Sequence, residues 1–118
     1  DQITLPERNL FSSSEEYFGV LYHELVHSTG HSSRLDREGV ATPQQFASES
    51  YSKEELIAEM GAGYLNNYTG ILDQNLLENS AAYIQNWLNE LRNDKQLLIE
   101  AASKAQKAVD YILNECPF

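Results

Sequence analysis

The three histidines of this 118-residue chain are confined to one short region, the run HELVH at positions 23–27 and His31 just after it. Residues four apart on a helix lie on the same face about one turn from each other, so the imidazoles of His23 and His27 can converge on one metal ion. Glu24 then projects beside that ion. This HExxH spacing is typical of sites in which two neutral imidazoles bind Zn²⁺ and the glutamate acts as general base on a zinc-held water.

A catalytic zinc ion normally has three protein ligands and one open position, so a third ligand must come from outside HELVH. His31 lies just past the motif, but the longer three-histidine pattern requires a histidine where this chain has Ser33. Glu55 and Glu59 are an i, i+4 pair, so one can bind zinc while the other orients a ligand histidine. Periodicity leaves the choice open, and each has an ordinary alternative: Glu55 in a capping box begun by Ser52, Glu59 as an exposed helical carboxylate.

Two further side chains could take part in catalysis by stabilising an oxyanion. One is His31, and the other is Tyr51, through its hydroxyl group. A packed or surface aromatic is the plainer interpretation of Tyr51, and Trp87 is expected in the core.

The helix that positions HELVH is expected to begin at Ser12 or Ser13, because each is followed three residues later by a glutamate, as in a capping box. It should end near Thr29, with Gly30 as a left-handed C-cap. Its apolar stripe is predicted to consist of Phe18, Leu21, Leu25 and Tyr22.

The remaining elements follow from periodicity and from helix-ending residues. Residues 1–5 alternate polar and apolar before a proline, which predicts a short strand. Residues 31–50 read as a loop suited to the rim of an active site. A second helix is expected over 52–68, closed by Gly70, and Ala62 and Gly63 beside its glutamates would permit close approach to another helix. Two scaffold helices, a C-terminal pair, should cover 80–92 and 95–114, the latter with Ala101 and Ala105 on its apolar side. The chain is therefore expected to be mainly α.

Composition indicates one globular domain, with 42% hydrophobic residues and a single cysteine, Cys116. That cysteine cannot form an internal disulfide, and neither a membrane-spanning run nor a signal peptide is evident, which favours a cytoplasmic protein. The net charge of −10 repels phosphate backbones. This segment alone is therefore expected to be a poor nucleic-acid binder.

Three runs together resemble the C-terminal zincin-like metallopeptidase domain of ArdC-type antirestriction proteins. They are HELVHSTGHSSRLDRE at 23–38, EELIAEMGAGYL at 54–65 and ENSAAYIQNWLNELRNDKQLLIEAASKAQKAVDYIL at 78–113. The resemblance implies an α+β zincin-like fold, a peptide or protein substrate, and carriage by plasmids, phages or conjugative elements. It also implies that the sequence is a fragment, preceded in the full protein by a single-stranded-DNA-binding domain.

The glutamate run is also similar to that of ImmA/IrrE-type zincins. There a ligand glutamate is followed at +3 and +7 by alanine and at +10 by leucine, as Glu55 is here by Ala58, Ala62 and Leu65. This similarity favours Glu55 over Glu59 as the third ligand.

The sequence thus predicts a zinc-dependent peptidase with Glu24 as general base. Two other hypotheses belong to different classes. An acidic domain could mimic DNA and occupy a restriction enzyme by charge, with a structural metal, although Lys95, Lys104 and Lys107 interrupt the acidic surface. A pseudoenzyme could keep the fold as an interaction platform and bind little metal.

Overall fold

The computed structural model describes residues 2–43, 45, 48–71 and 73–114, and within these ranges the chain is mainly α-helical, as predicted. The elements are a short 3₁₀ turn η1 (Arg8–Leu10) and the helices α1 (Ser14–Ser28), α2 (Glu38–Ala41), α3 (Glu49–Thr69), α4 (Gln74–Glu90) and α5 (Lys95–Leu113). None of the helices in the described ranges is both long and apolar enough to cross a membrane.

The strand predicted over residues 1–5 is absent from its described part, residues 2–5, which have no regular structure. A strand needs a neighbour that pairs with its amide and carbonyl groups. The alternating pattern occurs at one place in this chain, and no strand lies elsewhere in the described residues to pair with it.

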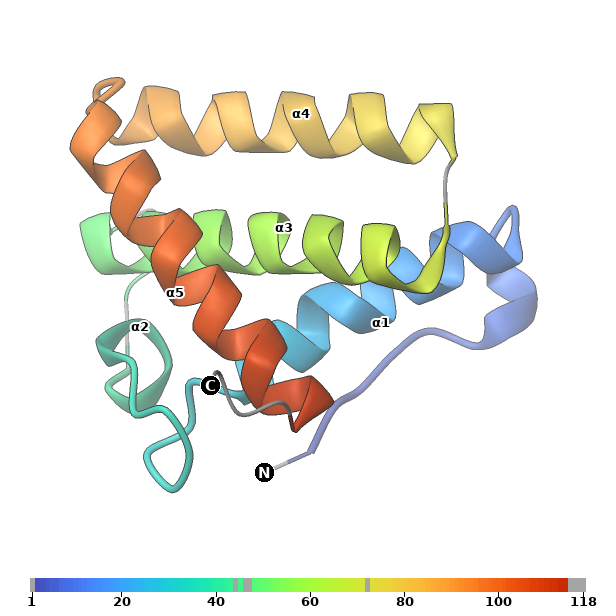
Figure 1. Cartoon of the computed structure of the whole chain (residues 1–118), viewed down its shortest axis with the longest axis horizontal. Helices are drawn as coiled ribbons and strands as arrows, with labels where there is room; N and C mark the ends of the chain where they lie inside the picture. The colour runs from blue at the N-terminus through green and yellow to red at the C-terminus, as the bar shows by residue number, and fades with distance from the viewer. Residues whose placement is uncertain (1, 44, 46–47, 72, 115–118) are drawn as a thin grey trace.

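Helix α3 is the centre of the fold, and α1, α4 and α5 all pack against it (Figure 1). The two C-terminal helices therefore each cover α3. Helix α5 packs against α3, and its small residues Ala101, Ala105 and Ala108 are buried in the core. The core cluster consists of Val26, Leu56, Ile57, Ala58, Leu65, Leu91, Ala101, Ala105, Ala108 and Val109.

The contact between α1 and α3 is closest where Val26 meets Gly61. A Cβ atom placed on Gly61 would lie 2.7 Å from Val26 Cγ2, whereas one on Gly63 would meet nothing within 4 Å. The prediction that Gly63 permits the close approach is therefore wrong, and Gly61 has that role. Val26 is also the one fully buried residue of α1, while the predicted stripe residues Phe18, Leu21 and Leu25 are only half-buried.

The start of α1 follows the capping prediction. Ser13 Oγ accepts a hydrogen bond from the Glu16 amide at 3.1 Å, and the Glu16 carboxylate accepts one from the Ser12 amide at 3.0 Å. The end does not, because Gly30 has no positive φ and the helix closes on Thr29 in a right-handed conformation. Glycine is needed at position 30 for space: a Cβ there would lie 2.6 Å from Val40 Cγ2.

Helix α3 begins earlier than predicted, at Glu49, because Ser48 caps it by accepting from the Tyr51 amide at 3.2 Å. Ser52 is inside the helix and only 1% exposed, so it cannot be an N-cap and Glu55 has no capping role there. Gly70 ends the helix with φ 77°, as predicted. Helix α4 also begins early, at Gln74, after the cap Asp73.

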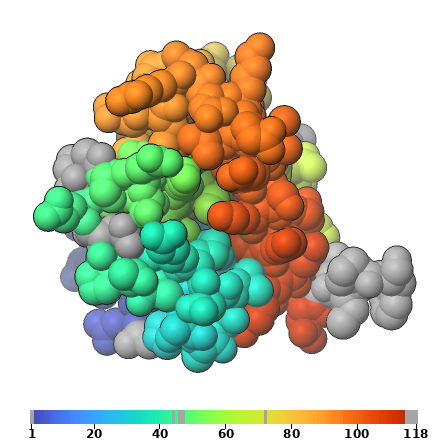
Figure 2. Space-filling model, turned by 90° about the vertical axis from the view of Figure 1, so that its left-hand side faces the viewer, coloured from blue at the N-terminus to red at the C-terminus, as the bar shows by residue number. Residues whose placement is uncertain are grey.

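The segment between α1 and α3 is mostly loop, as predicted, with the four-residue α2 as its helix in the described part. Figure 2 shows this segment beside the beginning of α3, on the same side of the molecule as part of α5.

Two glycine substitutions on α3 should have opposite effects on stability. Gly61→Ala should destabilise the fold by about 1–2 kcal/mol, because the overpacking against Val26 exceeds the gain of about 1 kcal/mol in helix propensity. Gly63→Ala is the matched control and should stabilise by up to about 1 kcal/mol, since its methyl group meets open space. Urea denaturation of both variants measures the difference, and equal stability would show that α1 and α3 are not in close contact at Gly61.

Candidate metal centre

Helices α1 and α3 bring three potential metal ligands together. His23 Nε2 and His27 Nε2 lie 3.0 Å apart, and each lies 3.2 Å from a carboxylate oxygen of Glu55. Among the residues that the structure describes, this is the one group of three or more histidine, cysteine or acidic side chains compact enough to hold an ion. The predicted trio is therefore assembled in space.

The chemistry and spacing of these donors suit a divalent metal. Two imidazole nitrogens and one carboxylate oxygen are a donor set that zinc uses in catalytic sites, with the fourth position open. Bonds of about 2.0–2.1 Å at tetrahedral angles would separate the donor atoms by roughly 3.3 Å. The observed separations of 3.0 and 3.2 Å are close to that value. The three side chains are 16–20% exposed, so the centre remains accessible from solvent.

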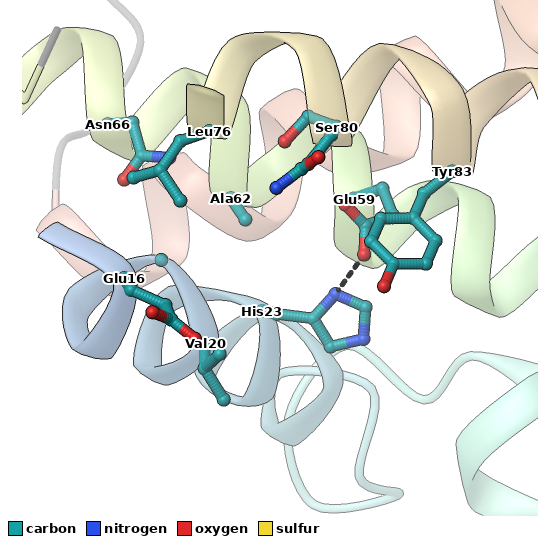
Figure 3. Close-up of a pocket in the computed structure, with 11 residues that line it drawn as sticks. Glu16, Val20, His23, Glu59, Ala62, Asn66, Leu76, Ser80 and Tyr83 are labelled. Carbon is teal, nitrogen blue, oxygen red and sulfur yellow. Dashed lines mark ion pairs between the residues drawn. The ribbon is translucent and has the colours of Figure 1, made fainter. Parts of the chain in front are cut away.

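Each of the two histidines is held by a further carboxylate. His23 Nδ1 lies 2.9 Å from Glu59 Oε1 (Figure 3), and His27 Nδ1 lies 2.8 Å from Glu54 Oε2. An Nδ1–H group that donates to a carboxylate leaves the lone pair on Nε2, the atom that faces the other potential ligands. Glu59 therefore lies where it can orient His23, which is one of the two roles that the sequence left open for it.

Arg37 holds Glu54 in turn. This arginine is 8% exposed, and it forms a two-pronged pair in which Nε donates to Glu54 Oε1 at 2.8 Å and Nη2 to Glu54 Oε2 at 3.0 Å. Its guanidinium also donates to Thr29 Oγ1 at 2.7 Å and to the Val26 carbonyl at 2.8 Å. Arg37 thus connects the loop after α1 with both helices of the centre, and its planar fork fixes the carboxylate in two directions.

The charges of these groups favour a cation at the centre. Burial opposes protonation of both histidines, but hydrogen bonds to Glu55 and Glu59 raise the pKa of His23 to about 10, and those to Glu54 and Glu55 raise the pKa of His27 to about 9. Burial also opposes ionisation of Glu55, yet the two imidazoles lower its pKa to about 2. In the metal-free protein, protons therefore supply positive charge that a metal ion would replace.

Tyr51 lies near Glu55. Burial raises the pKa of the Tyr51 hydroxyl, and so do the charge of Glu55, a hydrogen bond to it and the charge of Glu24. The Tyr51 ring packs edge-on against Trp87, with 5.7 Å between ring centroids. Tyr51 is thus a packed aromatic, as the plainer interpretation had it, and its hydroxyl also reaches the centre.

The structure does not bring His31 into this group. His31 Nδ1 accepts a hydrogen bond from the Ser33 amide at 3.1 Å and lies 2.7 Å from the Ser33 hydroxyl oxygen, within the turn that follows α1.

Sequence reasoning missed Glu54 and Arg37. Glu54 precedes Glu55 directly and so points about 100° away from it around α3, off the face on which ligands were sought. Its partner Arg37 lies in an irregular loop, where no periodicity predicts which residue it meets. The available signal was weak: an arginine in the loop between the two functional helices and a glutamate in the first turns of α3.

Replacing Arg37 by lysine should weaken metal binding by about 10- to 100-fold, the range expected when a residue that supports a ligand is lost. Lysine keeps the charge but cannot form the two-pronged pair with Glu54, so His27 would lose its fixed orientation. Competition titration with a chromogenic zinc chelator measures the affinity. Arg34→Lys is the control, because Arg34 donates to the Ser28 carbonyl at the end of α1. Equal affinities in the two variants would contradict the orienting role.

The thermal stability of the metal-free protein should fall as pH rises from about 6.5 towards 9. In the folded state the pKa values of His23 and His27 lie above the ordinary value of 6.5, which applies in the unfolded chain. The folded state therefore binds more protons than the unfolded state in this pH window, and it loses stability as those protons dissociate. With zinc the trend should reverse, because the ion competes with those protons. Melting curves between pH 6.5 and 8.5, with chelator or with zinc, test both slopes. Parallel slopes with and without zinc would contradict proton–metal competition.

Comparison with known proteins gives the fold and centre a family context. Residues 1–104 match the MPTase-PolyVal family, described as zincin-like metallopeptidases. The chain is 43% identical over 113 residues to a DNA primase TraC of Escherichia coli, covering 96% of this chain and 8% of that protein. It is 34% identical over 116 residues to the uncharacterized protein y4eC of Sinorhizobium fredii, covering 95% of this chain and 35% of that protein.

Two solved structures are also similar to this chain. The Mn(II)-bound crystal structure of the antirestriction protein ArdC from the R388 plasmid is similar with a TM-score of 0.71 and 42% identity, over 93% of this chain and 39% of that one. Its metal-free structure gives 0.64 and 44%, over 90% and 36%. This chain thus spans at most 39% of the length of these relatives. The resemblance to ArdC-type proteins is confirmed, and the chain belongs to the MPTase-PolyVal family of zincin-like metallopeptidases.

Proposed function

We propose that this domain is a zinc-dependent peptidase that hydrolyses peptide bonds of a protein substrate. The observation that carries the proposal is the grouping of His23, His27 and Glu55 with donor atoms 3.0–3.2 Å apart, beside a glutamate of the same HELVH run. Membership of a family of zincin-like metallopeptidases supports it.

His23 and His27 would hold the ion through Nε2, and Glu55 through its carboxylate. Zinc bound there would lower the pKa of a water molecule towards about 7 and polarise a substrate carbonyl group. Two imidazoles and a carboxylate are a common zinc donor set, which is why we propose zinc, although the related ArdC structure contains Mn(II).

Glu24 would act as the general base. It follows His23 directly in HELVH, and its charge contributes to the raised pKa of the Tyr51 hydroxyl. Its carboxylate would accept the proton of the attacking water and then pass it to the amine that leaves. Meanwhile Glu59 and Glu54 would keep both imidazoles in the tautomer that leaves Nε2 unprotonated.

Tyr51 would steady Glu55 in the resting site. Its hydroxyl has one proton, and while that proton is shared with Glu55 it cannot also be donated to a substrate oxygen. A role as oxyanion donor would require the hydroxyl to turn away from Glu55 once substrate binds.

We further propose that peptide cleavage serves an antirestriction function in the cytoplasm, as the name of the related ArdC protein suggests. The net charge of −10 disfavours contact with nucleic-acid phosphates. Single-stranded DNA would accordingly bind to another part of a longer protein, and this domain would contact a protein.

Glu24→Gln should lower peptidase turnover by about 10²- to 10⁴-fold, because the amide cannot accept the proton of the attacking water. Zinc content should remain about one ion per chain, since Glu24 is not among the proposed ligands. A quenched fluorescent peptide library and elemental analysis measure the two quantities. Glu15→Gln, an exposed glutamate of the same helix, should retain full turnover.

Unchanged turnover in Glu24→Gln would refute the proposed mechanism. The DNA-mimic hypothesis makes the opposite prediction for this variant: salt-sensitive binding to a restriction enzyme that does not change when Glu24 is replaced.

A further inference from the structure

A cavity of about 290 Å³ lies next to the candidate metal centre, on the side of His23 and Glu59 (Figure 3). Three helices enclose it, and each contributes residues at helical spacing, such as Glu16, Val20 and His23 on α1. The space exists because small residues of all three helices face it: Gly19 of α1, Ala62 of α3 and Ser80 of α4.

The cavity leads away from the metal centre along α1. In Figure 3, His23, Glu59 and Tyr83 lie towards one end, and Glu16, Asn66 and Leu76 towards the other. Glu16 and His23 are seven residues apart, which is about 10.5 Å along a helix axis. A substrate residue held beside the metal centre would therefore need a long side chain to reach Glu16.

The lining combines apolar walls with acceptors of positive charge. Val20, Ala62 and Leu76 supply the apolar surface, Glu16 supplies a carboxylate at the far end, and no lysine or arginine is among the described residues that line the cavity. The Ser12 amide and hydroxyl bind Glu16, which orients its carboxylate while leaving acceptor capacity.

Asn66 lies at the same end. Its Oδ1 atom is buried and is therefore not on the open surface of the cavity. Glu16 thus supplies the acceptor at this end. Glu59, by contrast, already accepts from His23.

We propose that this cavity is the specificity pocket of the peptidase and receives a lysine or arginine side chain of the peptide. The aliphatic stem would pack against Val20 and Leu76, and the cationic head would meet the Glu16 carboxylate. The inference rests on the proposed peptidase function. The cavity volume of about 290 Å³ is at the lower limit for small-molecule pockets, which suits one side chain.

Other side chains fit the lining less well. An acidic side chain would face Glu16 and Glu59 without a counter-charge. A long apolar one would pack against the walls but would remove water from the Glu16 carboxylate without replacing its hydrogen bonds. A short one would leave the far end unfilled.

The test is a set of quenched peptides that differ at one position beside the cleaved bond, where each carries lysine, arginine, norleucine, glutamate or alanine. Norleucine has the stem of lysine without the ammonium group. We expect lysine and arginine peptides to have the highest kcat/KM. Glu16→Gln should reduce the selectivity for lysine over norleucine by about tenfold, a typical effect of losing one charged hydrogen bond. Glu15→Gln, the neighbouring exposed glutamate, should keep that selectivity.

Binding of the lysine and norleucine peptides to the zinc-loaded Glu24→Gln variant separates this inference from the proposed function. Tighter binding of the lysine peptide that depends on Glu16, without cleavage by the unmodified chain, would support the pocket and overturn the peptidase function. Cleavage without preference for basic residues, or a preference that survives Glu16→Gln, would overturn the pocket and leave the peptidase function standing. If the peptides are neither cleaved nor bound, both the pocket and the peptidase function are overturned.

Discussion

The contact of Val26 with Gly61 is the constraint on which the candidate metal centre depends. Histidine and glutamate side chains are short, so ligands from two helices can share one ion only if the backbones lie close together. Val26 occupies one of the two unspecified positions of the HExxH motif. It packs against α3 while the histidines beside it reach the carboxylates. The same short run therefore supplies both the donors and the contact that holds them in range.

Charge is the second determinant of the centre. Helix α3 directs Glu54, Glu55 and Glu59 at two imidazoles, an arrangement that would be unfavourable without compensating positive charge. Arg37 compensates one carboxylate permanently, and protons or a metal ion compensate the others. Part of the acidity of this chain thus has a specific local use, which reduces the share of the net charge available for mimicry of DNA.

Local signals in the sequence predicted much of this structure. The Ser13 cap, the Gly70 C-cap and the alanine spacing of α5 each depend on neighbours within a turn or two, and the structure has all three. The pairing of His23 with His27 followed from the same periodicity. Glu55 as their companion did not, because it was favoured by similarity to a known family of zincins.

The predictions that failed depend on contacts between distant segments. A strand over residues 1–5 required a partner that the described chain does not provide. Gly30 was read as a C-cap when its lack of a side chain instead admits Val40, and Gly61, not Gly63, faces α1. The pair of Arg37 with Glu54 joins a residue within an irregular loop to a residue of α3. In each case the deciding neighbour lies outside the window in which helical spacing carries information.

The proposed ligands come from two helices separated by the loop that contains α2, and this has a consequence for the chain as a polymer. An ion bound to His27 and Glu55 would act as a removable cross-link that closes the segment between them into a ring. A covalent bridge across a loop of comparable length lowers the entropy of the unfolded chain by the equivalent of about 3.6 kcal/mol. The availability of metal in the cell would then set how long the domain survives against unfolding and degradation, apart from any effect on catalysis.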